Sequence, residues 1–416
     1  MLTPGLGKWI PASRFIKLEA ILLEAILLFL STLAFLAGVV IIYWTHSQYQ
    51  IEILVPSVPP PPPSPAPLIS VIVPARDEER NIRRCVEALL AQSYPNFEVI
   101  VVDDRSTDAT AQILAEIHKT AGEQPGKAAP LLRVLPGAEL PLGWAGKPHA
   151  LWQGAAVARG EWLCFVDADT FARPPMLTAA LVTAQDYQAD LFTILTEQKL
   201  GSFWEKAIMP VIFTALSVGF PAWRVNDPSR PEAIANGQFI LIRRSVYTAM
   251  GGHQAVYNQI AEDKALAEQV KQRGYRLIIA DGRGVAQTRM YTSLPEMWEG
   301  WTKNIFIGLQ ARLGLLLFGV LLGFAAALLL PLWLVGSLWW FAVSGSLLAA
   351  IVALQVILLW AYLLYLRSLA ACAFNISPLY AFTLPLAAFI FTLMMLASSL
   401  KVLTRQGVTW KGRKYI

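Results

Sequence analysis

Three stretches of this sequence have the length and composition of membrane-spanning helices. No charged residue occurs in Ala25–Trp44, in Leu313–Leu366 or in Ala370–Leu400. The first and third are each long enough to cross a bilayer once, and the second is long enough to cross it twice. Because a chain inside the hydrocarbon layer must satisfy its backbone polar groups internally, these stretches are expected to be helices. The sequence therefore predicts four spans, one of them an uncleaved N-terminal anchor.

The composition agrees with a membrane protein and excludes several other classes. Hydrophobic residues make up 55% of the 416 residues and charged residues only 15%, whereas soluble domains carry about 25% charged residues. The net charge of +5 has no basic and aromatic array beside it, so no nucleic-acid partner is predicted. The three cysteines are far apart in apolar surroundings, which indicates reduced thiols rather than disulfides or a zinc site.

The spans and a proline-rich segment divide the chain into five parts. Pro56–Pro67 is mostly proline, which predicts an extended, semi-rigid spacer, with an SH3-type ligand as the alternative. The expected organisation is an N-terminal anchor (1–46), a linker (47–67), an α/β domain (68–304), C-terminal transmembrane helices (305–403) and a basic tail (404–416).

Expected strands and helices alternate from residue 68 onward. The expected strands are Ile69–Val73, Phe97–Val102, Leu131–Leu135 and Trp162–Val166. The expected helices between them are Arg80–Gln92, Asp108–Lys119 and Pro148–Arg159. This alternation predicts a mainly parallel, Rossmann-like sheet with helices on its faces.

Acidic side chains follow three of these strands. Asp103 and Asp104 end the second strand, Asp167 and Asp169 follow the fourth, and the first runs into Arg76–Glu79. Open α/β sheets bind ligands at the carboxyl ends of their strands. Alternate residues of an extended chain point the same way, so Asp167 and Asp169 are expected to face one divalent cation that carries a diphosphate. A helix cap with a spare acid before Pro174 and Pro175 is the alternative for this pair.

Two further places carry charge at the start of an expected helix. Lys147 lies in Gly143–Pro148, where a lysine beside a helix N-terminus can reach a phosphate, although a solvated lysine is an equal alternative. Glu262 and Asp263 begin the expected helix Glu262–Arg273. Carboxylates at that position suit either a helix cap or a general base.

Three motifs in order resemble one known family. They are Ser-Val-Ile-Val-Pro-Ala-Arg-Asp-Glu-Glu (70–79), Glu-Val-Ile-Val-Val-Asp-Asp-Arg-Ser-Thr-Asp (98–108) and Phe-Val-Asp-Ala-Asp-Thr (165–170). Residues 68–304 resemble the family 2 inverting glycosyltransferases, which have the GT-A fold. The resemblance implies a UDP-, GDP- or dTDP-sugar donor and a divalent cation, Mg²⁺ or Mn²⁺. The cation would neutralise the leaving diphosphate as a Lewis acid.

The resemblance also implies roles for individual residues. Those expected to bind the nucleotide-sugar are Pro74, Arg76, Glu78, Asp104, Lys147 and Asp167. Asp169 would be the principal metal ligand, with Asp167 directed to the ribose or the metal. Asp263 would deprotonate the acceptor, with Glu262 in reserve, and inversion needs no second carboxylate as a nucleophile.

The acceptor side of the expected site is less sharply defined. Candidate residues for the acceptor or the diphosphate are Asn236, Gly237, Arg289, Trp301 and Lys303. Processive synthases of the family carry Gln-x-x-Arg-Trp near Trp301, and this chain lacks its Gln and Arg. The segment 298–304, Trp-Glu-Gly-Trp-Thr-Lys-Asn, resembles the membrane-bound subgroup that includes carotenoid and hopene-associated glycosyltransferases. An interfacial belt of Trp and Lys is the alternative.

The sequence thus predicts an inverting, multi-pass glycosyltransferase that glycosylates a hydroxyl of a membrane lipid, with a carotenoid or other isoprenoid as the first expectation. The alternatives are a polyprenyl-phosphate glycosyltransferase, a polysaccharide synthase and a non-catalytic scaffold. Gly201–Phe220 is expected to lie on the membrane surface, with a buried core helix as the alternative. A cytoplasmic catalytic domain and four spans would place both basic termini outside, against the positive-inside rule, so the span count stays open.

Overall fold

The fold is taken from a computed structural model of the chain, which describes residues 12–48, 51–122, 131–309, 313–404, 408–410 and 413–415. The chain divides into two compact units. One consists of Met1–Ser47 and Phe318–Thr392, and the other of Gln48–Leu317 and Leu393–Ile416. The start of the predicted anchor, with Lys8, and much of the predicted basic tail lie outside the described residues.

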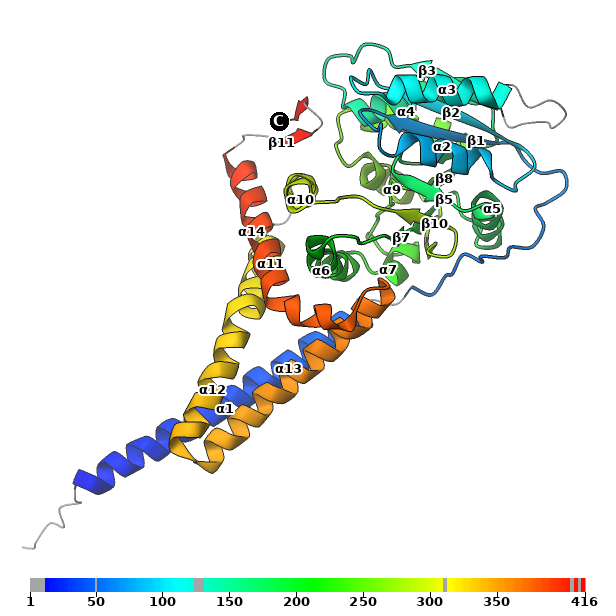
Figure 1. The fold of residues 1–416 in the computed structure, drawn as a ribbon. Coiled ribbons are helices and arrows are strands. Elements are labelled where there is room, and N and C mark those ends of the chain that lie inside the picture. The colour runs from blue at the N-terminus through cyan, green and yellow to red at the C-terminus, as the bar shows by residue number, and fades with distance from the viewer. Residues whose placement is uncertain are drawn as a thin grey trace, which may run out of the picture. The chain divides into compact units, whose positions relative to one another are not determined.

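The second unit is built on a seven-stranded sheet of order β3-β2-β1-β4-β8-β6-β9 (Figure 1). Its strands are β1 (Ile69–Ala75), β2 (Phe97–Asp103), β3 (Leu131–Pro136), β4 (Trp162–Phe165), β6 (Leu191–Leu195), β8 (Ile240–Arg243) and β9 (Leu277–Asp281). The neighbouring pairs are parallel except that β8 runs antiparallel to both β4 and β6. The prediction of a mainly parallel sheet is confirmed.

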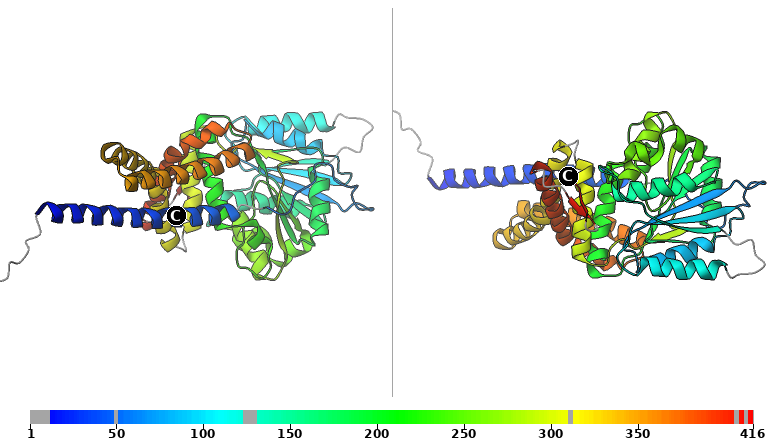
Figure 2. Two further views of the ribbon diagram at one scale, coloured as in Figure 1. Left: turned by 90° about the horizontal axis from the view of Figure 1, so that it is seen from below. Right: turned by 90° about the horizontal axis from the view of Figure 1, so that it is seen from above.

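Helices cover both faces of this sheet (Figure 2). Those packed on one face are α2 (Ile82–Leu90), α3 (Thr110–Gly122) and α5 (Met176–Asp186). Those on the other face are α4 (Gly146–Val157), α8 (Arg244–Ala249) and α9 (Glu262–Gln272). Strand β1 feeds both cores, because Val71 and Val73 belong to one hydrophobic cluster and Ile72 to the other. A strand buried on both faces needs a mostly apolar sequence, and this explains the run Val71–Val73.

A small second sheet begins directly after Asp169. It contains β5 (Thr170–Ala172), β10 (Ala286–Thr288) and β7 (Glu197–Gln198), in the order β5-β10-β7. Strands of two or three residues carry no periodic signal, so the sequence did not predict them. The sheet fixes the segment that follows the Asp167–Asp169 pair.

The segment before β1 is tied to the α/β unit at both ends. Ile53 and Val55 are buried, the Asp281 N–H donates to the Ile53 carbonyl (2.8 Å), and the Val55 N–H donates to the Asp281 carbonyl (2.9 Å). Beyond the prolines, the Tyr94 hydroxyl donates to the Pro67 carbonyl (2.7 Å). The predicted linker (47–67) therefore extends the β9 edge through residues 53–55, just before the proline-rich spacer.

Five helical segments among the described residues are long and apolar enough to cross a membrane. They are Glu24–Ser47, Phe203–Asn226, Leu317–Ser344, Leu347–Ala373 and Pro378–Lys401. Four of them match the predicted spans. They lie on α1 (Ala12–Ser47), on α11 (Leu313–Phe324) continuing into α12 (Leu330–Ser344), on α13 (Leu347–Ala373), and on a 3-10 turn (Pro378–Thr383) leading into α14 (Leu384–Leu403). These helices are consistent with membrane association.

The fifth segment is the one predicted to lie on the membrane surface. It forms α6 (Phe203–Gly219) and the short α7 (Ala222–Asn226). Helix α6 starts with a capping box between Ser202 and Glu205, and its Ala207–Pro210 segment is buried. One face of α6 is therefore part of the α/β unit, as in the alternative of a core helix.

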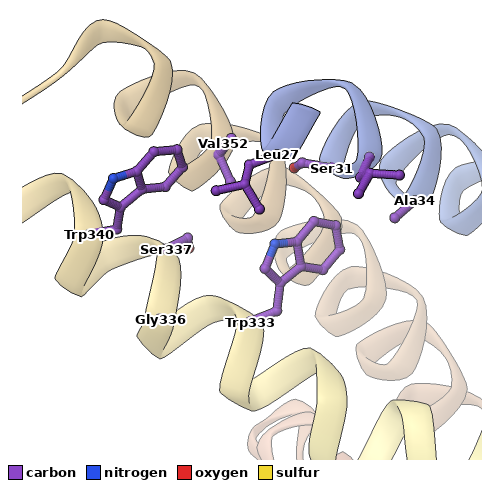
Figure 3. A pocket seen from close by; sticks show the side chains of 9 residues that line it. Leu27, Ser31, Ala34, Trp333, Gly336, Ser337, Trp340 and Val352 are labelled. Atoms are coloured by element: carbon purple, nitrogen blue, oxygen red, sulfur yellow. The ribbon is translucent and has the colours of Figure 1, made fainter. Parts of the chain in front are cut away.

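In the first unit, α1 and α13 are joined by polar side chains. The Ser31 hydroxyl donates to Gln355 Oε1, and Gln355 Nε2 donates to the Thr32 hydroxyl, each over 2.9 Å. Beside this pair lies an apolar groove of about 360 Å³ between α1, α12 and α13. Trp333 and Trp340 project into it from one side of α12 (Figure 3).

Candidate active site

The ends of β1 and β2 meet through Arg76. Its Nη1 donates to the backbone carbonyl of Asp104 (2.8 Å) and lies 4.0 Å from the Asp104 carboxylate. The Asp104 N–H in turn donates to the Ala75 carbonyl (2.7 Å). Asp104 is 3% exposed, and these hydrogen bonds fix the backbone that carries its carboxylate. Three predicted nucleotide-binding residues, Pro74, Arg76 and Asp104, thus lie together.

Glu78 belongs to the same corner. Its N–H donates to the Thr110 hydroxyl (2.8 Å), and its carboxylate accepts from the Asn81 amide (3.0 Å). The end of β3 approaches as well, because a side chain at Gly137 would lie 2.8 Å from the Asp103 carbonyl oxygen. Only glycine leaves room for that approach. The ends of β1 and β2 form one polar corner, as the sequence predicted, and the end of β3 joins them there, which the sequence did not predict.

Asp167 and Asp169 follow β4, with the Thr170 N–H donating to the Asp167 carbonyl (3.0 Å). This turn leads into β5 rather than directly into a helix. The helix that comes next, α5, begins only at Met176, and its N-cap residue is Pro175. The alternative that these acids cap a helix is therefore wrong.

Lys147 joins the strand end to the start of α9. Its Nζ lies 2.7 Å from Asp167 Oδ1 and 2.7 Å from Glu262 Oε1. The Glu262 side chain is 4% exposed and that of Asp167 is 26% exposed. The alternative of a solvated lysine is wrong, because the ammonium group is held by two carboxylates.

Asp263 is held by backbone groups on either side. Its Oδ2 accepts from the Gly237 N–H (3.0 Å), and its Oδ1 accepts from the Lys264 N–H (2.7 Å). A side chain at Gly237 would lie 2.9 Å from Lys147 Nζ and 3.0 Å from Asp263 Oδ2. Glycine at 237 is what allows the lysine and the carboxylate to share this space.

Carboxylates outnumber cations around Lys147, and both burial and this excess of negative charge shift the pKa values of the ionisable groups there. Burial raises the pKa of Glu262 to about 7, and repulsion from Asp263 and Asp167 adds to the rise against the attraction of Lys147. Burial alone would lower the pKa of Lys147, but Asp167, Glu262 and Asp263 raise it well above its usual value. Burial lowers the pKa of Lys303 to about 8, although Glu262 opposes the shift.

The donor set fits a divalent cation only with help from a ligand. Among the described residues, no three His, Cys, Asp or Glu side chains converge closely enough to hold a metal ion alone. Asp167 and Asp169 supply hard oxygen donors beside an excess of negative charge. Mg²⁺ is commonly held by one or two carboxylates together with substrate phosphates and water, and this pair matches that pattern.

The predicted acceptor-side residues separate into two kinds. The guanidinium of Arg289 pairs with Glu205, with Nε to Oε1 at 3.0 Å and Nη2 to Oε2 at 3.1 Å. The Asn236 amide donates to the Ile194 carbonyl (2.9 Å), and the ring of Trp301 is buried near Phe213. These three side chains have structural contacts.

Lys303 differs from that group. It lies on α10 (Leu294–Leu309), and its charge interacts with Glu262, Asp263, Asp167 and Lys147. Of the basic candidates near the chain's membrane segments, the structure brings Lys303 into the acidic region and gives Arg289 a partner elsewhere.

The sequence did not predict the support of the Lys147 loop. The Ala145 N–H donates to the Tyr257 carbonyl (2.7 Å), and the Trp144 ring lies 5.7 Å from that of Tyr257 and 5.5 Å from that of Trp152. Tyr257 is more than one hundred residues away in sequence. A contact at that separation leaves no local pattern, and the only local sign is Gly143, whose φ is +84°.

Comparisons with known proteins agree with this geometry. The sequence model described as "Glycosyl transferase family 2" matches residues 70–250. A 4,4'-diaponeurosporenoate glycosyltransferase of Staphylococcus aureus (strain MRSA252) is 28% identical over 267 residues, which is 60% of this chain and 66% of the relative. The protein of that name from strain USA300 is 28% identical over 249 residues, 58% of this chain and 61% of the relative. The matched region thus spans less than two thirds of either relative.

A solved structure has a similar fold over most of the chain. The mannosyltransferase PcManGT from Pyrobaculum calidifontis, in complex with GDP-Man and Mn²⁺, aligns with a TM-score of 0.52 and 18% identity. The alignment covers 92% of this chain and 99% of the mannosyltransferase. At this identity the likeness concerns the fold, which is GT-A.

Proposed function

We propose that the chain is a family 2 glycosyltransferase that moves a sugar from a nucleotide-diphosphate-sugar to a membrane lipid, with inversion. The observation that carries the proposal is the convergence of Asp167, Glu262 and Asp263 around Lys147. These groups come from three segments that are far apart in sequence. Such a cluster costs stability, since like charges are held together, and it is typical of a site where charge develops during a reaction.

The donor nucleotide would bind at the polar corner of β1, β2 and β3. Arg76 holds the backbone at Asp104, so the Asp104 carboxylate is positioned to accept hydrogen bonds from a ribose or base. Glu78 is fixed beside it by its N–H bond to Thr110. Asp169, with Asp167, would hold the divalent cation, and the cation supplies charge neutralisation for the leaving diphosphate.

Asp263 is the proposed general base for the acceptor hydroxyl. Its two oxygens are oriented by the N–H groups of Gly237 and Lys264, and it sits in the first turn of α9, where the helix dipole stabilises an anion. A single base is sufficient for direct displacement at the sugar carbon. The proton of the hydroxyl moves to Asp263 as the sugar–oxygen bond forms and the bond to the diphosphate breaks.

A lipid acceptor is supported by features outside the α/β domain. Long apolar helices bracket that domain in the sequence, and a tethered enzyme meets membrane substrates readily. The relatives named 4,4'-diaponeurosporenoate glycosyltransferase favour an isoprenoid acceptor. The groove lined by Trp333 and Trp340 has an apolar wall suited to such a chain. Because nucleotide-sugars are cytosolic, the α/β domain would face the cytoplasm.

The test is sugar transfer in membranes that contain the full chain. Membranes would be incubated with labelled UDP-, GDP- or dTDP-sugars and Mg²⁺ or Mn²⁺, and lipid extracts would be analysed by mass spectrometry. We expect a single hexose or deoxyhexose on an isoprenoid. A sugar linked to a polyprenyl phosphate, or a long polymer, would replace the acceptor assignment. Failure of every donor to label any product, with intact protein, would contradict the proposed function.

A further inference from the structure

Lys147 lies between two carboxylates, and one of them, Asp167, has a role in the proposed reaction. Its ammonium group lies 2.7 Å from Asp167 Oδ1 and 2.7 Å from Glu262 Oε1. Asp167 is two residues from Asp169, the proposed principal metal ligand. The lysine is therefore the counter-ion of the acidic group that a divalent cation would approach. Charge-assisted hydrogen bonds of this kind are short and among the strongest in proteins.

The backbone that carries Lys147 is fixed, whereas its ammonium group lies at the end of a long side chain that can adopt other rotamers. The Ala145 N–H bond to Tyr257 and the packing of Trp144 against Tyr257 anchor the loop. Lys147 is in the first turn of α4, and its side chain is 35% exposed. Four methylene groups allow the ammonium to move several ångströms without any backbone change. A rearrangement here is thus a side-chain event.

The backbone at Gly237 closes one side of the space around the Lys147 ammonium group. A side chain at Gly237 would lie 2.9 Å from Lys147 Nζ and 3.4 Å from Asp167 Oδ2. A second positive charge at Asp167 and Asp169 would be repelled by an ammonium that stays on Asp167, because like charges held close together at a protein surface repel each other. A diphosphate removes this conflict, since it offers the lysine another anion.

We propose that Lys147 is a displaceable counter-ion that makes divalent-cation binding depend on the donor diphosphate. Without a diphosphate, the lysine neutralises Asp167 and competes with the cation. With a diphosphate, the lysine exchanges its bond to Asp167 for one to a phosphate oxygen, so that cation and donor bind as a pair. This inference rests on the proposed function for the identity of the donor, and on the geometry alone for the competition.

The experiment is a titration of the purified full chain with Mn²⁺, followed by electron paramagnetic resonance of the free ion. It is done without nucleotide and then with UDP or GDP. We expect Lys147→Met to bind Mn²⁺ alone about tenfold or more tightly than the wild type. The nucleotide should strengthen Mn²⁺ binding to the wild type by more than it does for Lys147→Met. Equal Mn²⁺ affinity of the two proteins without nucleotide would overturn the proposal.

Two control variants distinguish displacement of Lys147 by the cation from an effect of the site's net charge alone. Lys147→Arg keeps the positive charge at the carboxylates and should bind Mn²⁺ alone as weakly as the wild type. Lys147→Met/Glu262→Gln removes one cation and one anion, so the net charge is unchanged, and it should keep the tighter Mn²⁺ binding. If the double variant returns to wild-type affinity, the effect is bulk electrostatics and the proposal is wrong.

The outcome also distinguishes this proposal from the proposed function. If no nucleoside diphosphate changes Mn²⁺ affinity in any variant, the dependence on the donor is overturned together with the assigned donor class. In that case, a gain for Lys147→Met without nucleotide still establishes competition at Asp167. Melting temperatures of all variants, read by tryptophan fluorescence, identify any loss of the folded state before the titrations are compared.

Discussion

Two buried carboxylates of the α/β domain, Glu205 and Glu262, have opposite surroundings. The side chain of Glu205 is 2% exposed and that of Glu262 is 4% exposed. Glu205 receives hydrogen bonds from Arg289 and from the Gly201 and Ser202 N–H groups. Burial opposes its ionisation, but these donors outweigh burial and lower the pKa of Glu205. Burial and neighbouring carboxylates instead raise the pKa of Glu262 to about 7.

The difference separates a structural ion pair from a group under electrostatic strain. Donors surround Glu205, whereas Glu262 shares one lysine with Asp167 and lies near Asp263. The pair of Glu205 and Arg289 connects the start of α6 to the segment that follows β10. The surroundings of Glu262 keep repelling charges together, which a fold tolerates where a ligand neutralises them. Substitutions at four positions test this contrast, and they are given in order of decreasing effect.

The largest effect is expected at the proposed base. Asp263→Asn should lower the rate of sugar transfer by about 10²- to 10⁴-fold, the usual range for loss of general base catalysis. The melting temperature should stay near that of the wild type, because an amide oxygen can still accept from one backbone N–H. Initial rates in membranes measure the effect. A rate within tenfold of the wild type would remove Asp263 as the base.

Arg289→Met should show the reverse pattern. It leaves Glu205 buried without its guanidinium, which costs about 3 kcal/mol at a site where the arginine is partly exposed. Thermal unfolding in detergent should fall by several degrees, and transfer per folded molecule should change little. Arg289→Met combined with Glu205→Gln is the matched control and should recover part of the loss. Full stability of Arg289→Met would show that the pair is not structural.

His253 offers a third kind of buried ionisable group. It is 1% exposed, bonds the Tyr247 hydroxyl through Nδ1 (2.9 Å), and burial lowers its pKa to about 3. An unfolded chain binds this proton below about pH 6.5, so its contribution to stability is complete above that pH and is lost as pH falls toward 3.

Between pH 7 and pH 5 this contribution falls by about 2 kcal/mol. The wild type should therefore lose stability relative to His253→Gln over that interval, as measured by thermal unfolding at both pH values. A constant difference between the two proteins would mean that His253 is not buried as a neutral group.

The smallest effect is expected at Lys303. Burial lowers its pKa to about 8, so its positive charge is present below that pH and is lost above it. If the charge supports the diphosphate, transfer at pH 9 should be about tenfold below the value at pH 7. Lys303→Arg keeps its charge and should remove this alkaline decline. The same decline in both proteins would assign it to another group.

The contrast between Glu205 and Glu262 also shows how much of the structure could be predicted from the sequence. The order of strands and helices and the polar strand ends were predictable, because a parallel sheet needs apolar runs and places their carboxyl ends at one edge. The pairing of Asp167 with Glu262 through Lys147 was not predicted. It depends on the register of three segments separated by long stretches of chain.

Arg289 and Lys303 illustrate the same limit at the other side of the site. Both were predicted as candidates for the diphosphate on equal grounds, since each is a basic residue just before the membrane segments. The partner of Arg289 is Glu205, which lies at the start of α6. The separation of the two residues follows from tertiary packing, and basic residues in a short window carry no information about it.

The most direct test of electrostatic strain at Glu262 is the melting temperature of Glu262→Gln at pH 8, without metal or nucleotide. In the wild type, a folded-state pKa of about 7 against an unfolded value near 4.5 means that stability falls as pH rises through this interval, by about 3 kcal/mol in total. Glutamine has no charge to bury. Glu262→Gln is expected to melt above the wild type at pH 8, and the difference should disappear near pH 4.5. A lower melting temperature for Glu262→Gln at pH 8 would show that Glu262 stabilises the fold as Glu205 does, and that its carboxylate is not under electrostatic strain.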